Sequence, residues 1–161
     1  MAEAVLVRVA QYAVGGAEVE LVTLGLGSCV AIALHDPVAR LGGLAHALLP
    51  DPSTARETSN PAKFALTVVP VLVAELERRG ARRERLRAKL VGGASMFATL
   101  LQTNGMNMGE RNVQAARTAL AALAIPVVAE DVGGDYGRSV RFAPGDGRLR
   151  VRSVARGEEE I

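Results

Sequence analysis

Residues 19–49 read VELVTLGLGSCVAIALHDPVARLGGLAHALL and are the most informative part of the chain. Apolar and polar residues alternate over Val19–Leu24, and apolar runs follow at Val30–Leu34 and Leu41–Leu49, so three strands are predicted. Asp36-Pro37 predicts a turn between the last two of these strands. Because the strands follow one another through short turns, we expect an antiparallel or mixed sheet.

The rest of the chain predicts two substantial helices and several further strands. Asn60-Pro61 has the form of an N-cap followed by proline in the first turn, and the helix that it begins is expected to end before Gly80. Glu110–Leu123 places apolar residues on one face and predicts the second helix. Further strands are expected at Ala4–Val9, Leu86–Val91, Val127–Ala129, Ser139–Phe142 and Arg148–Val154. We expect one domain over residues 1–161, with a frayed tail at about 157–161.

The composition suits a globular protein and argues against several functional classes. Hydrophobic residues make up 49% of the chain and charged residues 22%, which is enough for a sizeable core. Aromatic residues are 3% and the net charge is +2, so the stacking surfaces and strong positive charge of a nucleic-acid binder are missing. A single cysteine rules out an internal disulfide, and no run approaches the ~20 apolar residues of a membrane span. Since the first residues do not resemble a signal peptide, we expect a cytoplasmic protein with no nucleic-acid partner and no membrane insertion.

The only cysteine, Cys29, is predicted to lie opposite His46, one of two histidines. Directly opposed residues of an antiparallel hairpin have a constant index sum, and the midpoint of 29 and 46 falls between Pro37 and Val38, inside the predicted turn. The Cβ atoms of such a pair are about 4.5–5.5 Å apart, which would allow a contact between sulfur and imidazole. A bulge at Gly42-Gly43 would change this register.

A thiol beside an imidazole is the core of a site with a cysteine nucleophile. The imidazole takes the thiol proton and produces a thiolate–imidazolium pair. The glycines before Cys29 allow the backbone to approach a substrate, and Gly27 and Ser28 are the candidate residues for an oxyanion and substrate loop. A third group has to orient the imidazole, and both Asp36 and Thr23 are candidates for it.

The same residues have structural explanations. A lone cysteine in an apolar strand is most often a small buried hydrophobe, and a lone histidine between two alanines is most often a hydrogen-bonded core residue. His35 lies beside the turn and is interpreted as a surface residue. Two histidines and one cysteine without ligand spacing make a poor donor set, so no metal site is expected. Asn104, Asn107 and Asn112 cluster near the start of the second helix and are most simply explained by turns and helix capping.

Several of these residues also form a family pattern. Thr23–Val30, followed by Gly42–His46 and Leu49-Pro50, resembles the signature of the CheD family, the chemoreceptor glutamine deamidases of bacterial and archaeal chemotaxis. Three later blocks continue the resemblance in order along the chain, namely Lys89–Met96, Gly109–Val113 and Asp131–Arg138. The resemblance therefore extends over nearly the whole chain.

This resemblance implies a fold and a set of site residues. The fold is an α+β three-layer α/β/β sandwich with mixed or antiparallel sheets and two main helices, related to bacterial toxin deamidases. The catalytic set is a Cys–His–Thr triad, which by position is Cys29, His46 and Thr23, so Thr23 replaces Asp36 as the orienting candidate. Because a threonine is neutral, it orients the imidazole but does not stabilise imidazolium as a carboxylate would.

The resemblance also implies a function. We expect a protein-glutamine deamidase, an amidohydrolase that acts on cytoplasmic helices of methyl-accepting chemoreceptors. It would convert glutamine side chains to glutamate through a cysteine thioester, releasing ammonia and using no cofactor. The alternative is a regulatory partner that binds and stimulates a CheC-type phosphatase, with deamidation secondary. A redox-sensing thiol is a further alternative.

Overall fold

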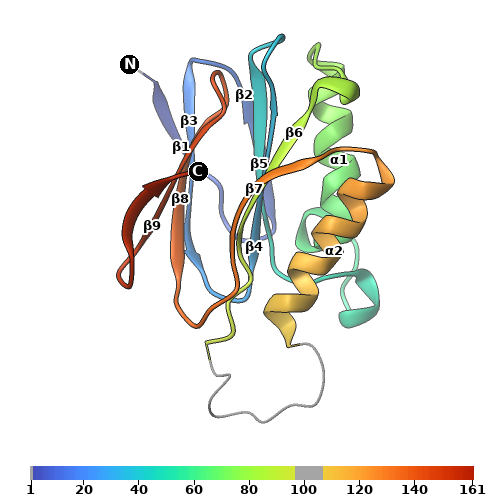
Figure 1. The fold of residues 1–161 in the computed structure, drawn as a ribbon. Helices are drawn as coiled ribbons and strands as arrows, with labels where there is room; N and C mark the ends of the chain where they lie inside the picture. The colour runs from blue at the N-terminus through green and yellow to red at the C-terminus, as the bar shows by residue number, and fades with distance from the viewer. Residues whose placement is uncertain (1, 97–106) are drawn as a thin grey trace.

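Three layers make up the part of the chain that the structure, a computed structural model, describes: residues 2–96 and 107–161 (Figure 1). Two five-stranded sheets face each other, and helices α1 (Ala65–Arg78) and α2 (Met108–Ala122) cover the outer face of one of them. The sheet beneath the helices is called the central sheet, and the other is called the outer sheet. The predicted α+β sandwich with two main helices is confirmed.

Both sheets are mixed. The central sheet has the order β2-β5-β4-β6-β7, and the outer sheet has the order β1-β3-β8-β9-β10. One pair in each sheet is parallel, β6 with β7 and β1 with β3, and the other neighbours are antiparallel. The strands of the central sheet are β2 (Gln11–Gly15), β5 (Leu41–Ala47), β4 (Val30–Asp36), β6 (Arg87–Gly92) and β7 (Val127–Val132). Those of the outer sheet are β1 (Glu3–Leu6), β3 (Val19–Leu26), β8 (Arg138–Ala143), β9 (Arg148–Ser153) and β10 (Gly157–Glu160).

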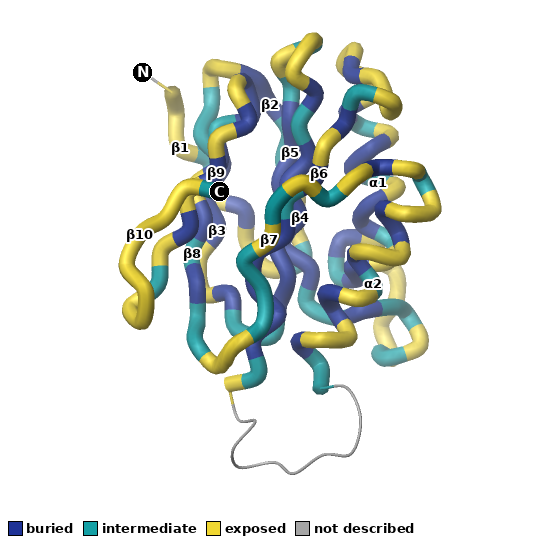
Figure 2. Tube along the Cα trace, in the orientation of Figure 1, coloured by how far each residue is buried: buried dark blue, intermediate teal, exposed yellow. Residues whose placement is uncertain are grey.

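Strand β4 is buried on both faces, because the helices lie on one side of it and the outer sheet on the other (Figure 2). Ile32 and Leu34 belong to the apolar cluster beneath the helices. Ala31 and Ala33 point the other way and belong to the cluster between the two sheets. Burial on both faces explains why this strand is a continuous apolar run rather than an alternating one.

Asparagine caps begin both helical regions. The side chain of Asn60 accepts from the N–H of Ala62 at 3.0 Å, but it caps the 3-10 turn η2 (Pro61–Lys63), and α1 itself begins only at Ala65. The side chain of Asn107 accepts from the N–H of Glu110 at 2.9 Å and caps α2. The other 3-10 turns of the described ranges are η1 (Pro52–Thr54) and η3 (Arg83–Arg85). Neither α1 nor α2, the long helices of these ranges, is long and apolar enough to cross a membrane.

Two segments differ from the predictions. Residues Gln11–Gly15, for which no strand was predicted, form β2 at one edge of the central sheet. The tail expected to be frayed forms β10, which pairs with β9. The Nζ atom of Lys89 donates to the carbonyl oxygen of Ile161 at 2.6 Å and to that of Gly147 at 3.0 Å, which fixes the tail against the central sheet. These contacts come from distant parts of the chain, so the polar composition of the tail does not reveal them.

Candidate active site

The predicted Thr23 and His46 meet in the layer between the two sheets. Thr23 belongs to β3 of the outer sheet, and His46 belongs to β5 of the central sheet. The Oγ1 atom of Thr23 lies 2.7 Å from Nδ1 of His46, so a hydrogen bond joins the two sheets at this point. Both side chains are fully buried, while Cys29, immediately before β4, is 8% exposed and packs in the same layer between the sheets.

The predicted pairing of Cys29 with His46 is wrong by two residues. The turn between β4 and β5 contains Pro37–Arg40, and this places His46 opposite Ala31. A shift of two residues keeps every side chain on its original face, since side chains alternate with a period of two. Cys29 and His46 therefore lie on the same face of the central sheet as diagonal neighbours, which are about 7–8 Å apart on adjacent strands and somewhat closer at Cβ.

A short chain of hydrogen bonds sets the tautomer of His46. The hydroxyl of Thr23 donates to the carbonyl oxygen of Val7 at 2.5 Å. A hydroxyl has one proton to donate, so in its contact with Nδ1 of His46 it acts as acceptor and the ring donates. The proton therefore resides on Nδ1, and Nε2 carries the free lone pair. This Nε2 is buried and has no hydrogen-bond partner among the described residues.

The resting site favours two neutral groups. Burial raises the pKa of the Cys29 thiol above its ordinary value, although the backbone N–H of Cys29 lowers it in part. Burial lowers the pKa of His46 from 6.5 to about 4. Near pH 7 the site therefore holds a thiol and a neutral imidazole rather than the predicted thiolate–imidazolium pair. An imidazole in this state is suited to take the thiol proton during attack, as a general base.

The turn Gly27–Cys29 is held through its carbonyl groups. The carbonyl oxygens of Gly27, Ser28 and Cys29 accept, in that order, from the N–H of Ala94, Nδ2 of Asn112 and the N–H of Gly93, each at 2.8 Å. By contrast, the N–H groups of Ser28 and Cys29 make no hydrogen bond with any other residue that the structure describes. Free N–H groups beside a nucleophile are what an oxyanion site requires. The roles of Ser28 and Gly27 themselves stay predictions.

Glycines allow a second loop and α2 to lie against this turn. A Cβ on Gly92, whose φ is +113°, would lie 2.3 Å from the carbonyl oxygen of Cys29. A Cβ on Gly109, in the first turn of α2, would lie 2.4 Å from the carbonyl oxygens of Gly93 and Ala94. Only residues without a Cβ permit these approaches, so the start of α2 lies directly against the Gly93-Ala94 loop. This loop in turn lies against the turn Gly27–Cys29, which is called the nucleophile turn.

Two other candidates from the sequence lie away from the triad. Asp36 is at the opposite end of β4, about 20 Å along the strand from Cys29 at ~3.3 Å for each residue. Its buried carboxylate accepts from the Arg85 side chain and from the N–H of Arg82, so it fixes a turn and does not orient His46. His35 is half-buried with its Nδ1 3.0 Å from the carbonyl oxygen of Pro144, so its interpretation as a surface residue was wrong. Within residues 2–96 and 107–161, no three His, Cys, Asp or Glu side chains are grouped to hold a metal.

Val7 and Asn112 are contacts that the sequence interpretation missed. Val7 contributes a backbone carbonyl, for which no side-chain pattern is informative. Asn107 caps α2 as predicted, whereas Asn112 is fully buried and contacts the nucleophile turn. The available signal was its position, since Asn112 falls on the same helix face as the apolar residues Val113 and Ala116. Asn104 lies outside the described residues.

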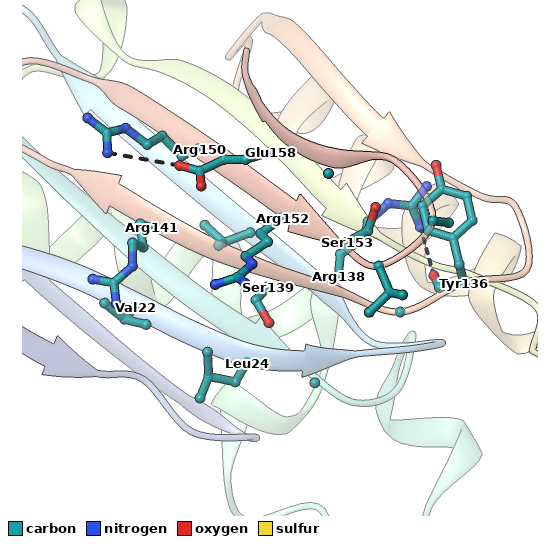
Figure 3. Close-up of a pocket in the computed structure, with 16 residues that line it drawn as sticks. Val22, Leu24, Tyr136, Arg138, Ser139, Arg141, Arg150, Arg152, Ser153 and Glu158 are labelled. Atoms are coloured by element: carbon teal, nitrogen blue, oxygen red, sulfur yellow. Dashed lines mark hydrogen bonds and ion pairs between the residues drawn. The ribbon is translucent and has the colours of Figure 1, made fainter.

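A separate hollow of about 830 Å³ lies on the exposed face of the outer sheet (Figure 3). Arginine side chains from β8 and β9 line it, with the Arg138 guanidinium 4.2 Å from the ring centroid of Tyr136 at one end. These β8 and β9 residues include Arg141, Arg150 and Arg152. None of the three triad residues lines the hollow, although Leu24 and Gly25, which follow Thr23 on β3, do. The hollow therefore adjoins the strand that carries Thr23 without enclosing the reactive groups.

Comparisons with known proteins place this geometry in a family context. The family model described as CheD chemotactic sensory transduction matches residues 48–153, a range that begins after the three triad residues. A protein from Caldanaerobacter subterraneus, named "Probable chemoreceptor glutamine deamidase CheD", is 47% identical over 141 residues, 88% of this chain and 87% of that relative. "Chemoreceptor glutamine deamidase CheD" from Thermotoga maritima is 46% identical over 154 residues, 96% of this chain and 94% of that relative.

Among solved structures, a protein of low sequence identity shares the fold. Neisseria meningitidis protein NMB0706 matches with a TM-score of 0.55 at 11% identity, covering 84% of this chain and 65% of that one. At that identity the likeness concerns the arrangement of strands and helices alone. The predicted relation to bacterial toxin deamidases stays a prediction.

Proposed function

This chain belongs to the CheD family of chemotactic sensory transduction proteins, and from that premise we propose that it is a protein-glutamine deamidase. The two relatives described above are named chemoreceptor glutamine deamidases, and we extend that activity and that substrate to this chain. Glutamine side chains on the cytoplasmic helices of chemoreceptors are converted to glutamate, which makes the chain a cytoplasmic enzyme. Cys29 is the proposed nucleophile, His46 the proposed base, and Thr23 the residue that orients this base.

One observation carries the proposal: Nε2 of His46 is buried and unpaired among the described residues, on the face of the central sheet shared with Cys29. Leaving a buried polar atom without a partner costs free energy, about 1–3 kcal/mol. Such atoms are rare in folded proteins, and a chemical role is one of the reasons for which they persist. A neutral histidine whose Nδ1–H is already donated offers Nε2 as a base.

The first half of the reaction forms a thioester. The thiol of Cys29 gives its proton to Nε2 of His46 as the sulfur attacks the side-chain carboxamide carbon of the glutamine. A C–S bond forms, the carbonyl electron pair moves to oxygen, and the N–H groups of Ser28 and Cys29 donate to this oxyanion. The imidazolium then protonates the amide nitrogen, the C–N bond breaks, and ammonia leaves.

The second half hydrolyses the thioester and restores the site. A water gives a proton to Nε2 of His46 as its oxygen attacks the thioester carbon. The tetrahedral intermediate collapses, the electrons of the C–S bond return to sulfur, and the imidazolium returns its proton to Cys29. One water is consumed, one ammonia is released, and a glutamine side chain has become glutamate without a cofactor.

The test is mass spectrometry of a chemoreceptor cytoplasmic fragment after incubation with the purified protein. We expect the wild-type protein to convert individual glutamines to glutamates, and we expect Cys29→Ala and His46→Asn to leave them unchanged. His35→Gln is the matched control, because His35 is the other histidine of the chain, lies at the end of β4 remote from Cys29, and is only half-buried. This control should convert the same glutamines as the wild type.

Two results would contradict the proposal in different ways. If the wild-type protein converts no receptor glutamine, the assignment of substrate is wrong. If the wild type and Cys29→Ala convert glutamines equally well, the assignment of the nucleophile is wrong.

Stimulation of a CheC-type phosphatase stays a prediction of the family resemblance. The Cys29→Ala variant separates this role from deamidation, since the substitution removes one buried sulfur and leaves the outer surfaces of both sheets unchanged. If the variant still increases phosphatase turnover, the two roles are independent. If stimulation disappears together with deamidation, the thiol or its immediate surroundings serve both.

A further inference from the structure

Asn112 is a fully buried amide at the junction of α2 with the nucleophile turn. Its Nδ2 donates to the carbonyl oxygen of Ser28 at 2.8 Å and to that of Leu48 at 3.0 Å. Ser28 directly precedes Cys29 in the chain, and Leu48 is the second residue after His46. A single side chain therefore links the two segments that carry the proposed nucleophile and base.

The bond to Ser28 fixes the direction of the next N–H group. The carbonyl of Ser28 and the N–H of Cys29 belong to one planar peptide unit, and the described peptide bonds are trans. In a trans unit the C=O and the N–H point in opposite directions. Since Asn112 draws the carbonyl toward the helix layer, the N–H of Cys29 points toward the layer between the sheets, where the Cys29 side chain packs.

The neighbouring contacts leave this N–H free. No other described residue accepts a hydrogen bond from the N–H of Ser28 or of Cys29. The carbonyl groups of Gly27 and Cys29 are held by Ala94 and Gly93, so the turn is anchored on both sides of the unit that Asn112 holds. The N–H of Cys29 also lies near its own sulfur, where it lowers the pKa of the thiol in part.

From these contacts we propose that Asn112 is a positioning residue, which holds the Ser28–Cys29 peptide so that the N–H of Cys29 stabilises the oxyanion formed on attack by the thiol. The amide does not touch the substrate and acts only through this peptide. The Oδ1 of Asn112 is buried and has no partner among the described residues, so the side chain serves here as a double donor. The inference rests on the thioester chemistry proposed above.

The test compares two reactions of the single cysteine that differ in whether an oxyanion forms. With p-nitrophenyl acetate, the thiolate attacks the ester carbon and an oxyanion forms; the C–O bond then breaks, leaving acetyl-Cys29 and p-nitrophenolate. With iodoacetamide, the sulfur displaces iodide at a saturated carbon, so no oxyanion arises. Asn112→Leu, of similar volume, removes both donors. We expect its acylation rate to fall about 10- to 100-fold and its alkylation rate to change less than about 3-fold.

Two further variants control for effects on folding. Asn112→Asp keeps the shape of the side chain but replaces the donating group with an acceptor, so it should show the same selective loss of acylation. Leu120→Ala removes buried apolar volume from the same helix two turns further on and leaves Asn112 in place. In this control the ratio of acylation to alkylation should equal that of the wild type, whatever its unfolding temperature.

The outcomes separate the inference from the proposed function. The positioning role would be overturned if acylation and alkylation fell by the same factor in both Asn112 variants. It would also be overturned if neither rate fell. The reagents are small and the receptor is absent, so this test does not depend on the substrate. If the wild type fails to deamidate receptors while the Asn112 variants still show the selective loss of acylation, the role of Asn112 is supported and only the choice of substrate is refuted.

Discussion

Acidification should weaken the folding of this chain through His46. This side chain is 1% exposed, and burial lowers its pKa from 6.5 to about 4. Between these two values the unfolded chain binds a proton that the folded chain does not, so the free energy of unfolding rises with pH. The contribution is present above pH 6.5 and is lost as the pH falls toward 4.

The magnitude follows from the same two values. The difference between the unfolded pKa of 6.5 and the folded pKa of about 4 corresponds to about 3 kcal/mol of unfolding free energy, at about 1.4 kcal/mol for each pKa unit. By pH 5, about 2 kcal/mol of this is already lost, because the unfolded chain is then almost fully protonated at this residue. For a domain of ordinary stability that is a large fraction of the total.

The assay is urea unfolding at pH 7 and pH 5, followed by circular dichroism, for the wild type and His46→Asn. Asparagine does not titrate, and its amide can still donate toward Thr23 in place of the ring Nδ1–H. Carboxylates that titrate in this range are common to both proteins and cancel in the comparison. The wild type should lose about 2 kcal/mol more than the variant between the two pH values.

Two measurements would refute the reasoning. Equal losses in the two proteins would mean that His46 is not buried as a neutral ring. Titration of the His46 ring protons near pH 6.5, observed by nuclear magnetic resonance in the folded protein, would lead to the same conclusion without reference to stability.

Thr23→Val should lower kcat for glutamine conversion about 10- to 100-fold with little change in KM, whereas Thr23→Ser should retain most of the activity. Equal losses in the two variants would show that the hydroxyl does not orient the base. Gly92→Ala should lower the free energy of unfolding by about 2–4 kcal/mol, because the added Cβ would lie 2.3 Å from the carbonyl oxygen of Cys29. Gly25→Ala, at a φ of +68° with no atom within 4 Å of the added Cβ, should lower the free energy of unfolding by only about 1–2 kcal/mol. Similar losses for Gly92→Ala and Gly25→Ala would contradict the steric argument. Asp36→Ala should lower the free energy of unfolding by about 1–3 kcal/mol, because the half-buried Arg85 side chain and the N–H of Arg82 lose their acceptor. The folded fraction of that variant should still convert glutamine at the wild-type rate. Loss of this activity without unfolding would show that Asp36 takes part in the active site.

The sequence predicted that Cys29 and His46 face the same way, even though the predicted register was wrong. The turn Pro37–Arg40 is centred one residue further along than expected, which moves the pairing by two residues. Because side chains alternate with a period of two, an error of two leaves the face unchanged. The prediction of a common face did not depend on the exact length of the turn. The prediction of direct opposition did, and in this turn the Asp36 carboxylate accepts from the N–H groups of Val38 and Ala39.

Other parts of the structure depend on contacts that no local pattern reports. The neutral state of the thiol and imidazole comes from burial between two sheets, whereas spacing alone suggested an ion pair. Strand β10 pairs with β9, the strand that precedes it, and the end of the chain accepts a hydrogen bond from Lys89, which is remote in sequence. The burial of Asn112 depends on how closely the glycines allow α2 to approach. For the thiol and imidazole, for Lys89 and for Asn112, the decisive partner lies on another layer of the fold.

The carbonyl oxygen of Val7, which holds the hydroxyl of Thr23, has a consequence for mutational scanning and for the comparison of homologous sequences. Every amino acid supplies a backbone carbonyl, so substitutions at position 7 that preserve the strand leave this anchor intact. The position will therefore tolerate side-chain changes as an ordinary apolar site does, and an alignment column will give no sign of its link to the proposed base. The anchor depends instead on the backbone path of Val7, which follows β1 and continues alongside β3. There the N–H of Val7 donates to the carbonyl oxygen of Val22 at 2.7 Å. Fusions or deletions that disturb this path would change the proposed active site without altering any of its three side chains.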